Sequence, residues 1–145
     1  MTTYKNYKLL FDIEPKSGQE LLYGKGRCYR PQKIYEFKKA IQIMAREQFK
    51  DKPIKKPIRA SVLYLFKRPV NHYVKNNPEN AVKCEFQSDV CVKRPDLSDN
   101  INKALFDALN GIVWVDDSQI YLLRLEKCWR NDKSQILIEL EYDEQ

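Results

Sequence analysis

Acid residues lie on both sides of a short apolar segment, and they are the residues of this sequence best suited to chemistry. Asp96 and Asp99 precede the segment, and Asp116 and Asp117 follow it. Carboxylates that meet at one point repel each other unless a cation lies between them. Lys103 lies within the segment and adds a positive charge beside the acids. The pattern therefore predicts a metal site with a lysine next to it.

The segment between the acids has the pattern of an amphipathic helix packed on one side. Ser98 or Asp99 is a natural N-cap, and Asn110-Gly111 is a strong stop because glycine adopts the left-handed conformation easily. At about 100° per residue, Asp99, Lys103 and Asp107 lie together on the polar side. The helix dipole at this end also favours anions such as phosphate. The apolar residues at helical spacing are Ile101, Ala104, Leu105, Ala108 and Leu109.

The order of these residues resembles the RusA family of Holliday junction resolvases, which are small endodeoxyribonucleases common in phages and prophages. The resemblance is carried by Asp-Asn-x-x-Lys at 99–103, Asp-Ala-Leu-Asn-Gly at 107–111 and Asp-Asp-Ser-Gln at 116–119. It is close from about residue 94 to residue 120. A weaker similarity lies upstream, where Gly-Arg-x-Tyr-x-Pro occupies residues 26–31.

The resemblance implies that Asp99 and Asp117 bind a metal and that Lys103 is the active-site lysine. One departure concerns the first aspartate, because the family usually has Asp-x-Asp-Asn. Here an extra residue separates Asp96 from Asp99, so Leu97 stands where the family's aspartate would be, and leucine cannot bind a metal. Asp96 is then the nearby candidate, provided that a bulge or a looser helix entry absorbs the extra residue.

The mechanism that the resemblance implies is metal-assisted hydrolysis of a DNA phosphodiester. Asp96, Asp99 and Asp117 would hold one or two Mg²⁺ ions, with Mn²⁺ as the alternative metal. Lys103 would add positive charge to the scissile phosphate, and Asn100 would orient a ligand carboxylate. Water is the nucleophile in such a reaction, so we expect neither a protein nucleophile nor a nucleotide cofactor.

The expected partner is a four-way DNA junction. Such a junction has near two-fold symmetry, so the resemblance implies a homodimer with one site per protomer. The net charge of +6 agrees with a basic surface for the DNA backbone. Solvated surface lysines explain that charge equally well. Candidate backbone contacts are Lys67, Arg68, Lys93, Arg94, Arg27 and Arg30.

Other interpretations remain open for the same residues. Asp99 suits a plain N-cap, and the pair Asp116-Asp117 suits a turn before a strand that begins at residue 120. For Asp107, an ordinary ion pair with Lys103 on the helix surface is the favoured interpretation. At the level of function, two alternatives are a metal nuclease for other branched phage replication intermediates and a catalytically inactive protein that binds DNA junctions.

Composition excludes several other kinds of site. Cys28, Cys84, Cys91 and Cys128 are widely scattered, and no pair has the short spacing of a zinc site. His72 is the only histidine, which argues against a histidine triad. No apolar leader or long apolar run is present, so we expect no membrane association. The expected location is the cytoplasm of a bacterium or of a phage-infected host cell, where the thiols stay reduced.

The predicted fold is a single α+β domain over residues 1–145, RusA-like, with two main helices on a mixed β-sheet. We expect loops over residues 16–31 and 67–93, and an antiparallel pair of final strands joined at 131–133. The predicted elements are a strand over Tyr7–Ile13, a helix from Pro31 to about Phe49, a strand over 58–66, the helix over 101–109, and strands over Ile120–Leu125 and Gln135–Tyr142.

Overall fold

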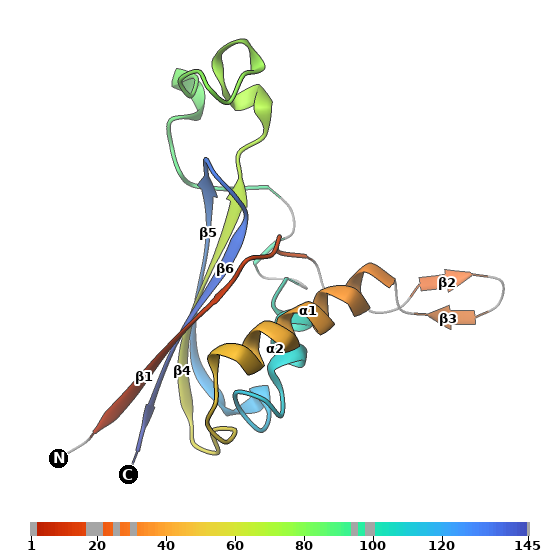
Figure 1. Ribbon diagram of the computed structural model, residues 1–145, viewed down its shortest axis with the longest axis vertical. Coiled ribbons are helices and arrows are strands. Elements are labelled where there is room, and N and C mark those ends of the chain that lie inside the picture. The colour runs from red at the N-terminus through yellow and green to blue at the C-terminus, as the bar shows by residue number, and fades with distance from the viewer. Residues whose placement is uncertain are drawn as a thin grey trace.

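The main sheet of the protein is mixed and has four strands in the order β1-β6-β4-β5 (Figure 1). The structure is a computed structural model that describes residues 3–16, 22–24, 27–29, 32–93, 96–97 and 101–144. Strand β4 runs parallel to β5 and antiparallel to β6, and β1 pairs antiparallel with β6. The predicted α+β class with a mixed sheet is confirmed. The strands are β1 (Tyr4–Phe11), β4 (Ile58–Lys67), β5 (Ile120–Arg130) and β6 (Gln135–Asp143).

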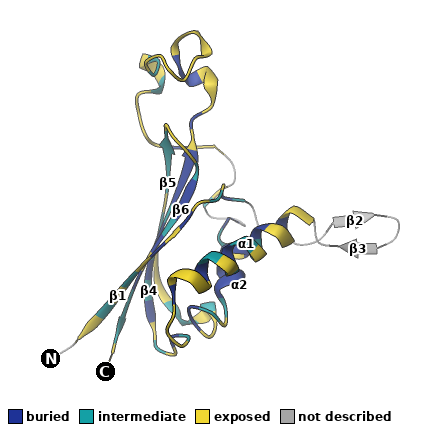
Figure 2. Ribbon diagram, viewed as in Figure 1, coloured by how far each residue is buried: buried dark blue, intermediate teal, exposed yellow. Residues whose placement is uncertain are grey.

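Two helices, α1 (Gln32–Gln48) and α2 (Ile101–Leu109), pack on one face of this sheet and against each other. All five apolar residues predicted to form the stripe of the second helix are fully buried, as Figure 2 shows for that element. Gly111 follows the helix with φ of +80°, so it supplies the left-handed stop that the sequence indicates. Among the described residues, no helix is long and apolar enough to cross a membrane.

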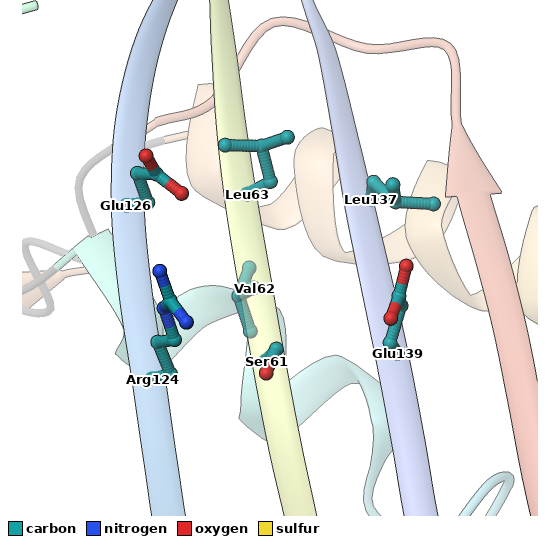
Figure 3. Close-up of a pocket in the computed structure, with 7 residues that line it drawn as sticks. All are labelled: Ser61, Val62, Leu63, Arg124, Glu126, Leu137 and Glu139. Atoms are coloured by element: carbon teal, nitrogen blue, oxygen red, sulfur yellow. The ribbon is translucent and has the colours of Figure 1, made fainter. Parts of the chain in front are cut away.

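Alternation along the strands separates a buried face from an open face. Even-numbered residues of β4 and β6, such as Val62 and Ile138, are buried toward the helices. Odd-numbered residues point to the other side, which neither α1 nor α2 covers. There, Leu63 and Leu137 lie among charged side chains in a shallow hollow of about 220 Å³ (Figure 3). The core is therefore one layer between the sheet and the helices.

The structure corrects four details of the predicted elements. The first strand begins and ends earlier than predicted, at Tyr4–Phe11. Strand β5, predicted to end at Leu125, continues to Arg130. Residues 16–31, predicted as a loop, contain a small antiparallel pair of strands, β2 (Leu22–Gly24) and β3 (Arg27–Tyr29). The last two strands run antiparallel as predicted, but β4 lies between them. Most residues of β4 are buried, which fits its place between two neighbouring strands that cover both of its edges.

Residues 68–92, which we call the arm, extend beyond the end of the sheet (Figure 1). This stretch was predicted as a loop, and it contains three single turns of 3₁₀ helix. They are η1 (Val70–His72), η2 (Val74–Asn76) and η3 (Cys84–Phe86). Its two ends meet at the sheet, where Arg68 N donates to Arg130 O at 2.8 Å and Trp129 N donates to Asp89 O at 2.8 Å. The arm is therefore anchored to the end of β5.

Arg68 organises the base of the arm from inside. Its side chain is only 3% exposed. All five guanidinium N–H groups have an acceptor when His72 Nδ1 is unprotonated. The acceptors are Asn131 Oδ1 at 3.0 Å, Phe86 O at 2.9 Å, His72 Nδ1 at 3.5 Å, Ser88 O at 3.2 Å and Asp89 Oδ1 at 2.9 Å. The prediction that Arg68 contacts the DNA backbone is wrong, because its donors face inward and are all used.

We expect Arg68→Met to lower the free energy of unfolding by about 2 to 4 kcal/mol, because several carbonyl groups lose a charged donor. Hydrogen exchange at amides of the arm should also accelerate, while exchange in the sheet changes little. Lys67→Met is the matched control, because Lys67 is the exposed neighbour. Denaturant unfolding and hydrogen exchange measure both effects, and equal losses in the two variants would contradict this role for Arg68.

Candidate metal and phosphate site

The turn before β5 assigns different tasks to two adjacent aspartates. A 3₁₀ turn, η4 (Asp117–Gln119), begins directly after Asp116. Ser118 N donates to Asp116 Oδ2 at 3.1 Å, and Asp116 N donates to Gln119 Oε1 at 2.8 Å, so the two ends form a capping box. The hydrogen bonds from Ser118 hold the pKa of Asp116 below its usual range. The turn that was the alternative interpretation of this pair is present, and Asp116 is its cap.

Gln119 fixes this turn to the rest of the domain. Its side-chain Nε2 donates to Ile54 O at 2.8 Å and to Lys56 O at 3.0 Å. Nearby, Ile54 N donates to Val113 O at 2.8 Å, so the segment after α2 is tied to the same region. The turn that carries Asp117 is thus held from both sides before the chain enters β5.

Asp117 is the aspartate that remains available for chemistry. Its side chain is half-buried, and its carboxylate makes no hydrogen bond or ion pair with any residue in the described part of the chain. A half-buried carboxylate without a partner loses hydration without compensation, so a cation or a hydrogen-bond donor is favoured beside it. Carboxylate oxygens are ligands that Mg²⁺ prefers. The chemistry of Asp117 fits a divalent metal.

The short described stretch of Asp96 and Leu97 is tied to the centre of the sheet through Asn102. Asn102 Nδ2 donates to Leu97 O at 3.1 Å, and Asn102 Oδ1 accepts from the Tyr64 hydroxyl at 2.5 Å. Tyr64 is fully buried in β4, and burial raises the pKa of its phenol, so the hydroxyl stays protonated and donates. Asp96 itself is exposed. The bond at Leu97 therefore holds the stretch in which the extra residue occurs.

The other predicted site residues have different positions. Asp99 and Asn100 lie outside the described residues, so the structure does not place them. Lys103 is exposed on the first turn of α2. Asp107 forms an ion pair with Lys38 Nζ of α1 at 3.5 Å, which joins the two helices. Within the described ranges, no three acid, histidine or cysteine side chains gather closely enough to hold a metal.

The candidate DNA contacts also differ in where the structure places them. Lys67 and Lys93 are exposed, and Lys93 Nζ lies 5.5 Å from the centre of the Phe66 ring. The backbone of Arg27 belongs to β3, while the side chain of Arg27 and the whole of Arg30 and Arg94 lie outside what the structure describes. Two exposed lysines therefore remain as placed candidates near the end of the sheet.

Sequence reasoning missed Asn102, Tyr64 and Gln119. Gln119 had a recognisable pattern, since Asp116 and Gln119 have the spacing of a capping box. Asn102 had a weaker signal, as an amide directly after Ile101, the first residue of the apolar stripe. Nothing local identified Tyr64, because its place in β4 is 38 residues from its partner.

We expect Asn102→Ala to lower the free energy of unfolding by about 1 to 3 kcal/mol, because the buried hydroxyl of Tyr64 loses its acceptor. Tyr64→Phe combined with Asn102→Leu should cost less than the sum of the single changes, since neither polar group is then left alone. Denaturant unfolding of the single and double variants measures this coupling. Strict additivity would show that the hydrogen bond does not contribute.

Comparison with known protein families is informative for most of the chain. A search of curated protein sequences found no match. The family model described as endodeoxyribonuclease RusA matches residues 12–141, which is most of the chain. This range includes β4, β5, most of β6, both helices and the turn that carries Asp117, and it begins directly after β1. The match also agrees with the resemblance indicated by the acid and lysine motifs. The chain therefore belongs to the RusA family of endodeoxyribonucleases.

Proposed function

We propose that this protein resolves four-way DNA junctions by paired, symmetric hydrolysis of phosphodiester bonds during recombination and repair, with Mg²⁺ as the metal. The observation that supports this most directly is the half-buried carboxylate of Asp117. It has no partner in the described part of the chain and directly follows an aspartate that the turn already uses. Family membership supplies DNA as the substrate class.

The residues that would hold the metal are Asp117, Asp99 and Asp96. Their oxygen donors fit Mg²⁺, and Mn²⁺ takes similar ligands. When bound, the metal lowers the pKa of a coordinated water and neutralises charge on the scissile phosphate. Asp117 contributes from a turn that is fixed on both sides. Asp96 contributes from a stretch that Asn102 holds through the carbonyl of Leu97.

The remaining side chains act on the phosphate and on the ligands. Lys103 presents an ammonium group from the first turn of α2, where the helix dipole also attracts anions. It would stabilise negative charge as it develops on the phosphate. Asn100 would orient a ligand carboxylate. Attack by water in line with the leaving 3′ oxygen leaves a 5′ phosphate and a 3′ hydroxyl, which a ligase can seal.

We expect Asp117→Asn to abolish cleavage of a four-way junction while junction binding is preserved or stronger, because a metal ligand and a charge that repels phosphate are both removed. Asp116→Asn is the matched control, since asparagine caps a turn about as well as aspartate. It should cut at close to the wild-type rate. Cleavage in Mg²⁺ and binding in EDTA measure the two effects, and wild-type cleavage by Asp117→Asn would remove the proposed site.

The same assay separates the alternative functions and the role of Asp96. Equal cutting of a junction, a flap and a linear duplex would indicate a nuclease for branched intermediates in general. Binding without any cutting would indicate an inactive junction-binding protein. For Asp96→Asn, a loss as large as that of Asp99→Asn identifies a metal ligand, whereas near-normal turnover shows that the extra residue has removed Asp96 from the metal.

We also propose that the protein acts as a homodimer through the outer edge of β5. Residues 89–91 cover the second half of that edge, as the bridge between Val90 and Cys128 shows. The first half has no strand partner on that side within the described ranges, and it exposes Tyr121, Leu122 and Leu123. An unpaired, apolar strand edge is a surface that a second strand can extend. Two-fold pairing there would also place both copies of Asp117 near the interface.

We expect the wild-type chain to sediment as a dimer and Leu122→Arg to sediment as a monomer, because the change places like charges next to each other across the two-fold axis. Ile43→Arg is the matched control on α1, since Ile43 is 53% exposed and Leu122 is 52% exposed. Sedimentation velocity at micromolar concentration measures the mass. A wild-type monomer, or a dimer that survives Leu122→Arg, would contradict the proposed interface.

A further inference from the structure

A hollow of about 250 Å³ lies where the arm meets the sheet. Arg68 forms part of its wall, and Phe86 and Trp129 contribute aromatic surface. The rim carries Val90 and Val92. Neither the metal ligands nor the proposed dimer edge uses this hollow. Its lining belongs to the arm and to the last residues of β5.

The aromatic wall of the hollow is held in a fixed arrangement. The His72 ring stacks on Phe86, with centroids 4.0 Å apart and planes inclined by 7°. Trp129 meets the His72 ring edge-on, with centroids 5.0 Å apart and an angle of 78°. Trp129 also packs edge-on against Phe66, with ring centroids 6.5 Å apart. Trp129 remains half-buried, so part of the indole is accessible at the hollow.

The charges around the hollow do not favour an anion. The guanidinium of Arg68 already donates to five acceptors and is paired with Asp89, so it has no donor left for a phosphate. Desolvation and the charges of Arg68 and Lys83 hold the pKa of His72 below its usual range, so the ring stays neutral. Glu85 at the rim is a hydrogen-bond acceptor and would repel phosphate. The hollow therefore suits a neutral planar group that offers N–H donors.

The rim of the hollow is close in the sequence to Asp96, one of the proposed metal ligands. Val92 is 88% exposed and Val90 is 67% exposed, which leaves two apolar side chains uncovered at the mouth. The same segment continues through Lys93 to Asp96, so a group bound here sits on the chain that enters the site. Lys93 is exposed beside it and can contact the DNA backbone.

We propose that this hollow receives an unstacked nucleobase of the branched DNA, packed against Trp129 between the two rim valines. Bases at a branch point have lost part of their stacking, so moving one into a pocket costs little. Stacking on an aromatic side chain then contributes to affinity, and every base offers a ring face. The amino groups of a base provide donors for Glu85. This proposal rests on the proposed function, because that function supplies the branched DNA.

Tryptophan fluorescence tests the proposal directly, with EDTA present so that no cleavage occurs. The chain has two tryptophans, and Trp114 is fully buried, so a bound base can quench only Trp129. We expect a four-way junction to quench the wild-type protein and to leave Trp129→Phe unquenched. A junction with an abasic site at the captured position, found by placing the abasic site at each branch-point nucleotide in turn, should bind roughly five- to tenfold more weakly.

A rim variant provides a test that does not disturb folding. Val92→Asn should reduce junction affinity several-fold and remove the abasic penalty, because the apolar cover of the base is lost. Val70→Asn is the matched control, since Val70 is in the arm, is 55% exposed and does not line the hollow. It should bind as the wild type does.

The outcomes separate this proposal from the proposed function. Junction cleavage in Mg²⁺ without quenching and without any abasic penalty overturns the base pocket and leaves the resolvase proposal intact. Quenching with an abasic penalty, but no cleavage, supports the pocket and overturns the resolvase proposal. A wild-type protein that neither binds nor cuts a junction overturns both.

Discussion

The central position of β4 is the constraint on which the rest of this structure depends. The strand is hydrogen-bonded along both edges, parallel to β5 and antiparallel to β6, and its inner side chains are buried against the helices. From this strand, the Tyr64 hydroxyl reaches the helix that carries Lys103, and Arg68 directly after the strand organises the arm. A change in the place of β4 would therefore move the site and the arm together.

Two neighbouring aspartates in one short turn have different roles. Asp116 uses its carboxylate to cap the turn, and that local bond leaves the next carboxylate directed elsewhere. Gln119 fixes the same turn to backbone carbonyls of a distant segment. Asp117 therefore lies on a rigid turn whose hydrogen bonds use the side chains of Asp116 and Gln119 and not its own carboxylate. Rigid support of this kind is what a metal ligand needs, because ligand geometry must be maintained before the metal binds.

The arm follows the same principle at the other end of the sheet. A buried cation collects carbonyl groups from a segment that has little regular structure of its own. The stacked pair of His72 and Phe86 then closes the base of the arm against Trp129. A long excursion with only single turns of helix can thus be well defined, because two of its backbone carbonyls accept from one buried guanidinium and others pair within the arm.

The sequence by itself determined the α+β class, the second helix with its buried stripe and glycine stop, and the turn before the strand at residue 120. These features depend on local spacing, which repeats with the helix or the strand. Only the tertiary structure decided that β4 separates β5 from β6 and that Arg68 faces inward. It also decided that Asp107 pairs with Lys38 rather than Lys103 and that Tyr64 supports Asn102. Each of those contacts joins residues that chain folding brings together, and no local pattern encodes which distant donor will meet which acceptor.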